Sequence, residues 1–206
     1  MSLCFTTTAM ARPEIVERTY GSFKDNLKGI DWKNTTLFIN IEPLPKPDAV
    51  NAVIEVAKET FGKVVARTPE NANFTRAVSW CWSQVDTDYV LHLEDDWVLI
   101  KEMNIEKLIK PFDNPKTKQV VLRAYSYAYE KMCLSPSIIR SSWVKRFEFD
   151  YNLNPEVQLR KPWVKPGYIH VPHKEIVVKD IGRNWIKGQD YQKPGHKASF
   201  TSWEKK

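Results

Sequence analysis

The sequence predicts an α/β protein with a mixed, mainly parallel sheet between layers of helices (αβα). Two observations predict this fold. Strand-like runs alternate with helical patterns of about ten to fifteen residues over the first two-thirds of the chain, which implies crossover connections. Polar residues follow four of these runs, at the edge where parallel sheets bind ligands. A chain of 206 residues can form a sizeable core, and we expect one domain over residues 1–206.

Strand character is concentrated in runs that are rich in Val, Ile, Thr, Leu and Phe. Between the second and third of these runs, residues 43–47 contain three prolines. We expect a loop there, because proline cannot donate a ladder hydrogen bond. The predicted strands comprise residues 3–8, 36–41, 63–67, 89–93 and 119–124.

Amphipathic helices are predicted between the first four strands. Pro13 occupies the first turn of the first helix, and Asp48 is expected to cap the second. The clearest helix covers residues 73–85, where the apolar residues fall on one stripe. We expect Asn71 or Asn73 to be its N-cap.

The last third of the chain differs from the rest. From about residue 125, aromatic and basic residues are interleaved, prolines recur and few helices can be recognised. We expect an extension of the same domain that carries loops over the edge of the sheet. The last dozen residues, which end in Trp203-Glu204-Lys205-Lys206, are expected to be a mobile tail.

Composition narrows the classes of protein. The chain has 42% hydrophobic residues and no long apolar run, so we expect no stable membrane insertion. Cys4, Cys81 and Cys133 fit neither a metal spacing nor a disulfide framework, and a cytoplasmic protein is expected. The net charge of +6 suits nucleic-acid binding or an enzyme whose substrate carries phosphates. Dinucleotide-binding and Walker motifs are absent from the sequence.

One predicted strand, residues 89–93, runs straight into three carboxylates, Glu94, Asp95 and Asp96. Like charges at this spacing repel one another, so a cation or a donor-rich ligand is expected beside them. Oxygen ligands without a neighbouring cysteine suit Mn²⁺ or Mg²⁺. The alternative is an acidic turn that caps the following segment.

The triplet, the opening turn Thr6-Thr7-Thr8-Ala9-Met10-Ala11-Arg12-Pro13 and the strand order together resemble glycosyltransferases of the GT-A fold, of the family-2 type. In that group a strand ends in an Asp-x-Asp motif, which this chain matches in a Glu-x-Asp form. The Glu-Asp-Asp form also resembles the N-acetylglucosaminyltransferases that begin complex N-glycan branching. The resemblance covers residues 2–125.

This resemblance implies that the two parts of the domain have different roles. Residues 1–125 would form a Rossmann-like half that binds the nucleotide sugar, and residues 126–206 would bind the acceptor and close the site. The implied reaction is metal-dependent transfer of a hexose from a nucleoside-diphosphate donor, with a UDP-sugar as the first expectation. The acceptor would be a glycan or another hydroxyl compound, and the transfer would invert the configuration.

The same resemblance gives each carboxylate of the triplet a role. Asp96 would coordinate the metal that bridges the two donor phosphates. Glu94 would face the ribose or reach the metal through water. Asp95 would orient neighbouring groups or point away.

Residues after the other strands are assigned to the donor in the same way. Thr6, Thr8 and Arg12 would hold the nucleotide, with Arg12 near phosphate. Glu42 would contact the base or ribose, and the alternative is a solvated residue before a proline turn. Arg76, at the start of the third helix, would help to hold diphosphate or sugar hydroxyls.

A late segment around Asp180 resembles the loop that closes over the diphosphate. Arg183 would clamp the diphosphate there. Many relatives carry a histidine in this loop as a metal ligand, where this chain has Asp180. Asp180, His170, His173 or water would therefore complete the metal shell.

Inverting transfer needs a general base that deprotonates the acceptor hydroxyl. Glu156 is the preferred candidate, because family-2-type enzymes carry their base at the entry to a helix beyond the fifth strand. Asp150 is the second candidate and Glu148 the third. Alternatively, Glu156 is a first-turn residue that the helix dipole favours.

Two other functions remain open at this point. Sugar-1-phosphate nucleotidyltransferases have a related layered sheet, although they carry a Gly-rich loop where this chain has threonines. A non-enzymatic basic module for polyanions or glycans would use the triplet as a structural cap. Within the transferase class, the basic last third of the chain leaves a phosphorylated or nucleic-acid acceptor open.

Overall fold

The computed structural model describes residues 2–123, 132–160, 169–172, 175–192, 199 and 201–206. Within these residues one large sheet contains β1 (Leu3–Ala11), β3 (Thr36–Pro45), β4 (Lys63–Arg67), β5 (Tyr89–Glu94), β8 (Thr117–Val121), β9 (Ser137–Arg140) and β10 (Ile169–Pro172). Their order is β10-β8-β9-β5-β1-β3-β4. β9 is antiparallel to both neighbours, and the other neighbouring pairs are parallel. The prediction of a mainly parallel, mixed sheet is confirmed.

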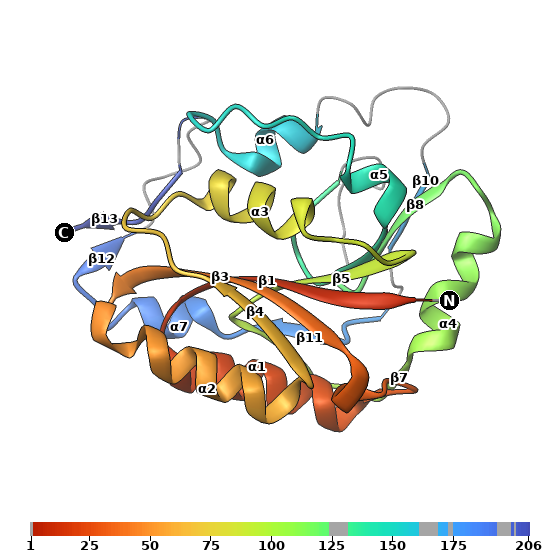
Figure 1. The fold of residues 1–206 in the computed structure, drawn as a ribbon, viewed down its shortest axis with the longest axis horizontal. Helices are drawn as coiled ribbons and strands as arrows, with labels where there is room; N and C mark the ends of the chain where they lie inside the picture. Colours follow the sequence, from red (N-terminus) through yellow and green to blue (C-terminus); the bar gives the residue numbers. More distant parts are fainter. Residues whose placement is uncertain (1, 124–131, 161–168, 173–174, 193–198, 200) are drawn as a thin grey trace.

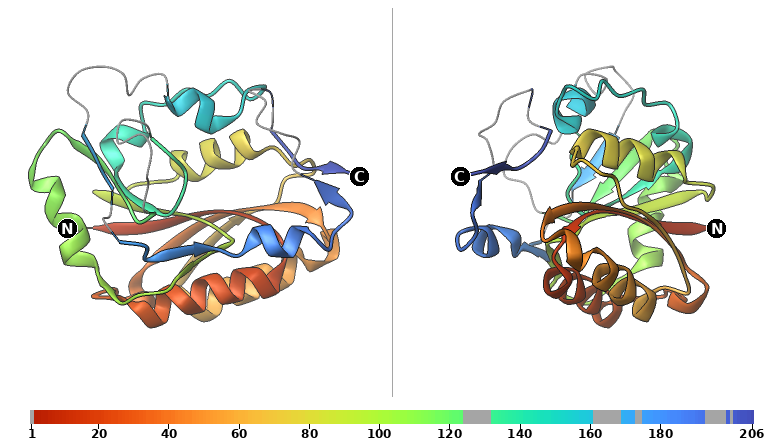
Figure 2. Two further views of the ribbon diagram at one scale, coloured as in Figure 1. Left: turned by 180° about the vertical axis from the view of Figure 1, so that it is seen from behind. Right: turned by 60° about the vertical axis from the view of Figure 1, so that its left-hand side comes forward.

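Helices cover both faces of this sheet. They are α1 (Pro13–Asn26), α2 (Val50–Thr60), α3 (Phe74–Ser83), α4 (Ile105–Ile109), α5 (Ser141–Val144), α6 (Pro155–Arg160) and α7 (Gly182–Ile186). α1 and α2 lie side by side on one face, whereas α3, α5 and α6 lie on the other (Figures 1 and 2). The predicted αβα layering is therefore confirmed. None of the helices in the described ranges is long and apolar enough to cross a membrane.

Shorter elements connect these layers. The short strands form the pairs β2 (Leu27–Lys28) with β7 (Met103–Asn104), β6 (Trp97–Leu99) with β11 (Val178–Asp180), and β12 (Tyr191–Gln192) with β13 (Glu204–Lys205). The 3₁₀ turns are η1 (Trp32–Asn34), η2 (Pro47–Ala49) and η3 (Lys110–Asp113). β13 belongs to the segment that was expected to be a mobile tail, and it is instead paired with β12.

The central strand β1 packs against both helical layers. Eight of its nine residues are buried. Phe5 belongs to the apolar cluster that contains Tyr20 of α1 and Val53 of α2, whereas Cys4 belongs to the cluster that contains Trp82 of α3. Successive side chains of a strand point to opposite faces, so β1 contributes side chains to both layers. This explains why β1 shows no alternation between buried and exposed residues.

The register of the sheet brings the polar strand ends together. Thr8 of β1 lies opposite Asn40 of β3 on one side and opposite Glu94 of β5 on the other. Asn40 in turn lies opposite Arg67 of β4, and Met10 lies opposite Glu42. The prediction that four strand ends share one edge is confirmed, because parallel strands end on the same side of a sheet.

The predicted loop over residues 43–47 is wrong in part, because β3 continues to Pro45. The register slips by two residues, so that Ala11 of β1 lies opposite Pro45. On the β4 side the last pair is Asn40 with Arg67. Among the described residues, no strand pairs with β3 on that side beyond Asn40, and its prolines need no donor there.

Helix starts were predicted with mixed success. α1 begins at Pro13, as expected. The Asn73 side chain caps α3 by accepting a hydrogen bond from the Arg76 N–H, which confirms the capping interpretation of Asn73. The Asp48 cap is wrong, because Asp48 lies inside η2 and α2 begins two residues later without a side-chain cap.

Gly62, between α2 and β4, tests how tightly this connection packs. A Cβ atom at Gly62 would lie 1.6 Å from the backbone oxygen of Lys33, and a backbone atom cannot move aside. We expect Gly62→Ala to lower the free energy of unfolding by about 2–4 kcal/mol in urea denaturation. Gly21→Ala in α1 is the matched control, since a Cβ there meets nothing within 4 Å and alanine should add up to about 1 kcal/mol. Equal stability of the two variants would contradict this packing.

Candidate active site

The acidic triplet forms a turn that is fixed from two sides. Glu94 ends β5, and the turn leads into β6. The Asp95 N–H donates to the Thr8 carbonyl of β1 at 3.2 Å. The Thr19 hydroxyl of α1 donates to the Asp95 carbonyl at 2.6 Å. The neighbouring strand and helix therefore hold the backbone of the triplet in place.

Arg12 and Asp95 form a buried ion pair at the centre of the site. Arg12 Nε lies 2.8 Å from Asp95 Oδ2, and Arg12 Nη2 lies 2.6 Å from Asp95 Oδ1. Each residue is only 3% exposed. The Met10 N–H also donates to Asp95 Oδ2, at 3.0 Å. Asp95 is therefore neither a bystander nor a direct ligand candidate, because its two oxygens are occupied by β1 and Arg12.

Arg12 has a different position from the one expected. Its Nη2 donates a second time, to Asp96 Oδ2 at 2.8 Å, and the Trp185 ring of α7 covers it at 5.1 Å. Burial alone would lower the pKa of Arg12, but Asp95 and Asp96 outweigh burial and raise it. The side chain stays charged and is committed to carboxylates. These contacts give Arg12 the role of a structural anchor next to the cavity instead of that of a free phosphate donor.

Asp96 is more accessible than Asp95, with 20% of its side chain exposed. The Ile181 N–H donates to its carbonyl at 2.8 Å. The Asp96 carboxylate lies directly against Gly182, so a larger residue at position 182 would push the Asp96 side chain aside. The pKa of Asp96 is raised to about 6. Burial is the largest cause, the Arg12 charge opposes it, and the charges of Asp95 and Asp180 add to it.

Asp180 precedes α7 and approaches Asp96. Its Oδ1 accepts hydrogen bonds from the N–H groups of Gly182 (3.0 Å) and Arg183 (3.3 Å). Its Oδ2 accepts from Arg183 Nε at 2.9 Å, and the Arg183 side chain is 78% exposed. The structure thus brings Asp180 and Asp96 together, as the sequence suggested, while Arg183 lies outside the cavity.

The carboxylates around Asp96 fit a divalent metal of the kind that binds together with nucleotide phosphates. The described residues contain no group of three side chains that could hold a metal ion, so the expected trio of Asp96, Glu94 and Asp180 is not present. Glu94 instead accepts a hydrogen bond from Trp97 Nε1 at 3.0 Å. A magnesium-like ion needs only one or two carboxylates when substrate phosphates complete its shell. Asp96 with Asp180 meets that requirement.

A cavity of about 80 Å³ lies beside these carboxylates. Its walls come from the ends of β1, β3 and β5, from the start of α3 and from the last residues of the chain. The lining residues are Thr8, Ala9, Met10, Arg12, Glu42, Phe74, Glu94, Asp95, Asp96, Ser202 and Trp203. Sequence reasoning missed Phe74, Ser202 and Trp203, because nothing in a linear pattern shows which aromatic residues reach a distant strand end.

Glu42 is a buried carboxyl in this cavity. It is 6% exposed, and its Oε1 has no hydrogen-bond partner among the described residues. Burial raises its pKa to about 7; the backbone N–H of Asn73 lowers it, and Asp95 raises it. The interpretation of Glu42 as a solvated residue is therefore wrong. An unpaired, buried carboxyl is costly for the fold and gives a bound ligand a strong partner.

Besides Asp180 and Arg183, four more of the expected site residues do not line the cavity. Thr6 lies deeper in the sheet, where its hydroxyl is 3.0 Å from Nδ1 of buried His92, whose pKa burial lowers to about 3. Arg76 lies over the Tyr151 ring, with Cζ at 4.6 Å from the ring centre. The other two are Glu156 and Asp150.

The two base candidates lie on a segment that packs along α3. Asn73 Nδ2 donates to the Tyr151 carbonyl at 3.0 Å, and the Thr75 hydroxyl donates to the Leu153 carbonyl. Asp150 is exposed and accepts from Asn152, whereas Glu156 is half-buried in the first turn of α6. His170 belongs to β10, and His173 lies outside the described residues.

Breaking the buried pair should destabilise the protein strongly. We expect Asp95→Ala to lower the free energy of unfolding by about 3–5 kcal/mol, since it leaves the Arg12 charge buried and unpaired. Glu55→Ala is the control, because it removes the exposed Glu55–Lys58 pair and should change stability by less than about 1 kcal/mol. Chemical denaturation measures both. A loss at Asp95 no larger than at Glu55 would contradict the anchoring role.

Glu42 should make stability fall as the pH rises. Unfolded Glu42 loses its proton near its ordinary pKa of 4.5, whereas folded Glu42 keeps it up to about pH 7. The folded state therefore binds more protons in this window, and stability falls across it. We expect Glu42→Gln to match the parent near pH 4.5 and to exceed it at pH 8 by up to about 3 kcal/mol in urea denaturation. A constant difference across this range would count against the buried carboxyl.

Comparisons with known proteins agree with this fold. The model of glycosyl transferase family 2 matches residues 45–165, which is more than half of the chain. A comparison with curated protein sequences found no match. The family match favours the transferase interpretation over the nucleotidyltransferase and the non-enzymatic binding module.

Solved structures share the fold at low sequence identity. The mannosyltransferase PcManGT from Pyrobaculum calidifontis, in complex with GDP-Man and Mn²⁺, has a TM-score of 0.65 at 10% identity, over 86% of this chain and 56% of its own. TarS 1–349 from S. aureus, in complex with UDP, has a TM-score of 0.62 at 10% identity, over 85% of this chain and 58% of its own. The chain thus spans little more than half the length of these two structures. It belongs to glycosyl transferase family 2 and has a GT-A-like fold.

Proposed function

We propose that this enzyme transfers a sugar from a nucleoside-diphosphate donor to a hydroxyl acceptor with the help of a divalent metal, and with inversion. The cavity at the ends of β1, β3 and β5 carries the proposal. Asp96, with Asp180 beside it, lies at one end of this cavity, and Glu42 lies in its wall. Ligands of open α/β sheets bind at such strand ends.

Asp96 and Asp180 would hold a Mn²⁺ or Mg²⁺ ion together with the donor phosphates. When bound, such an ion stabilises the negative charge that develops on the departing nucleoside diphosphate. Arg12 and Asp95 would keep Asp96 in place, because they fix the turn that carries it. The solved complexes of PcManGT with Mn²⁺ and GDP-Man support a metal and a nucleotide sugar for this chain as well.

Glu42 and Thr8 would bind the nucleoside part of the donor. The unpaired Oε1 of Glu42 can accept a hydrogen bond from a base or ribose, or can donate one while protonated. TarS 1–349 has been solved with UDP and with UDP-GlcNAc, at TM-scores of 0.62 and 0.55. A UDP-sugar is therefore the donor that we propose first.

Glu156 is the proposed general base, with Asp150 as the alternative. Both lie on the segment tied to the start of α3, and Phe74 at that start lines the cavity. The base would take the proton of the acceptor hydroxyl as it attacks the donor sugar. Residues 126–206 would bind this acceptor, a glycan or another hydroxyl compound, within one domain over residues 1–206. We propose that the protein acts in the cytoplasm.

Donor binding should require the nucleotide and the metal together. We expect UDP with Mn²⁺ to raise the melting temperature of the protein more than the two do separately, because Asp96 and the nucleotide phosphates would hold the ion together. Asp96→Ala should abolish this joint effect and reduce sugar transfer at least about 100-fold, while its own melting temperature stays close to the parent's. A fully active Asp96→Ala protein would overturn the proposed site.

A further inference from the structure

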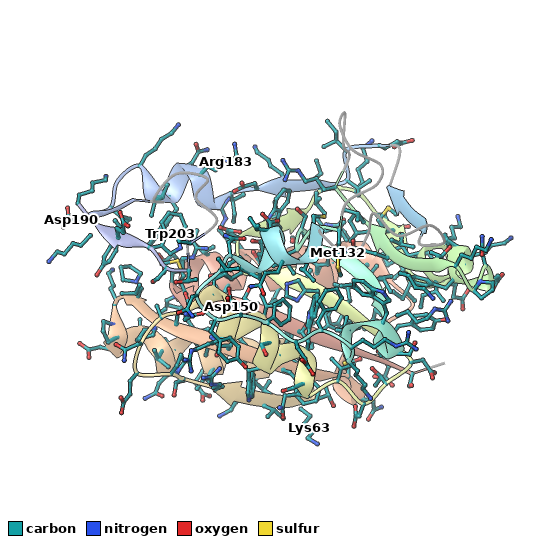
Figure 3. All side chains as sticks on the ribbon, turned by 90° about the horizontal axis from the view of Figure 1, so that it is seen from above. Lys63, Met132, Asp150, Arg183, Asp190 and Trp203 are labelled. Atoms are coloured by element: carbon teal, nitrogen blue, oxygen red, sulfur yellow. The ribbon has the colours of Figure 1, made fainter. Side chains whose placement is uncertain are left out.

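Residues 201–206, which we name the strap, lie across the proposed donor site. Ser202 and Trp203 of the strap line the cavity together with Glu42 and Phe74. In Figure 3 Trp203 lies between Arg183 and Asp150 at this end of the molecule. An aromatic side chain from the last residues of the chain is thus part of the wall of the site.

Hydrogen bonds to the backbone of α3, of β12 and of the residues before β12 help to hold the strap. The Thr201 carbonyl accepts a hydrogen bond from the Phe74 N–H at 2.7 Å. β13 pairs with β12 over two residues, and the N–H of Lys206 donates to the Asp190 carbonyl at 2.7 Å. Lys206 Nζ also donates to the Gln189 carbonyl at 2.7 Å.

These contacts are easier to break than those of the other walls. Residues 201–203 are half-buried and residues 204–206 are exposed. Water replaces exposed hydrogen bonds at little cost, so segments of this kind open locally before the rest of a fold does. The opposite wall consists of central strands and the buried Arg12–Asp95 pair, which cannot move without loss of the core.

The cavity is small for a nucleotide sugar. It measures about 80 Å³, whereas cavities that enclose small-molecule ligands have roughly 300–1,000 Å³. A nucleoside diphosphate with its sugar needs more room than lies between the strap and the strand ends. Among the described walls, the strap is the more exposed one, and it pairs with β12 over only two residues.

We propose that the strap occupies part of the donor site in the ligand-free enzyme and that the donor displaces it, with Trp203 as the side chain that leaves. The inference rests on the proposed function, because it concerns the same cavity. The apparent affinity for the donor is then reduced by the fraction of molecules whose strap is closed. Strap opening also removes the acceptor of the Phe74 N–H, which gives a direct readout.

Titration calorimetry with UDP and Mn²⁺ tests the proposal on three variants of the full chain. Trp203→Ala enlarges the cavity, because it removes a side chain from the cavity wall. Lys206→Ala removes the hydrogen bond from Lys206 Nζ to the Gln189 carbonyl, so it loosens the strap without changing the cavity lining. We expect both to bind UDP more tightly than the parent, by about fivefold for Trp203→Ala. Lys205→Ala is the control, because its exposed side chain lies outside the cavity, and its affinity should equal the parent's. Thermal unfolding confirms that each variant is folded.

Hydrogen exchange on the parent protein provides a second measurement. The Phe74 amide bonds to the strap, whereas the Asp95 amide bonds to Thr8 in the sheet. We expect UDP with Mn²⁺ to accelerate exchange at Phe74 and not at Asp95. Slower exchange at Phe74 on binding would overturn the proposal, since it would mean that the strap closes over the nucleotide.

The calorimetric outcomes separate this proposal from the function on which it rests. Weaker binding by Trp203→Ala and Lys206→Ala would show a strap that assists binding, and it would overturn displacement while it supports the donor site. Equal binding by all four proteins would overturn displacement alone. If neither UDP nor GDP binds to any of them with Mn²⁺, the proposed function fails, and the displacement proposal fails with it.

Discussion

The buried ion pair between Arg12 and Asp95 is the constraint on which the rest of the site depends. Arg12 is the N-cap residue of α1, and its carbonyl accepts hydrogen bonds from Ile15 and Val16. The pair therefore joins the end of β1, the start of α1 and the turn after β5 in one place. Neither charge could stay in this interior without the other, because an isolated buried charge is far more costly than a hydrogen-bonded pair.

The same pair explains why one carboxylate remains available for chemistry. Asp95 turns toward Arg12 and the Met10 N–H, so Asp96 projects toward the cavity and α7. Asp180 approaches Asp96 from the β11 side and raises its pKa, because two neighbouring carboxylates disfavour each other's charged form. The site thus has a carboxylate end at Asp96 and a nucleoside end at Glu42. Trp203 lies among the residues that line it.

Local patterns were sufficient for the framework of the fold. The helical stripe of residues 73–85 is visible in the spacing of its apolar residues, and burial follows that spacing. The strand-forming run of β1 is also visible in the sequence, and eight of its nine residues are buried. Pro13 and Asn73 marked helix starts because their effects are local. The prolines at 43–45 suggested a loop, but β3 continues through them. The strand tolerates them because, among the described residues, β4 pairs with β3 only as far as Asn40, and this is a property of the sheet that the segment itself does not reveal.

Sequence patterns were enough to predict the alternation of strands and helices over the first two-thirds of the chain, the meeting of polar strand ends at one edge, and the place of Asp96 and Glu42 at that edge. Which groups pair at this edge became visible only in the folded chain. It assigned Arg12 to Asp95, placed Thr6 with His92 in the interior, and brought Trp203 into the cavity. The physical reason is that periodicity depends on neighbours within a few residues. Ion pairs, orphaned carboxyls and cavity walls instead depend on atoms that are distant in the chain and become neighbours only in the packed fold.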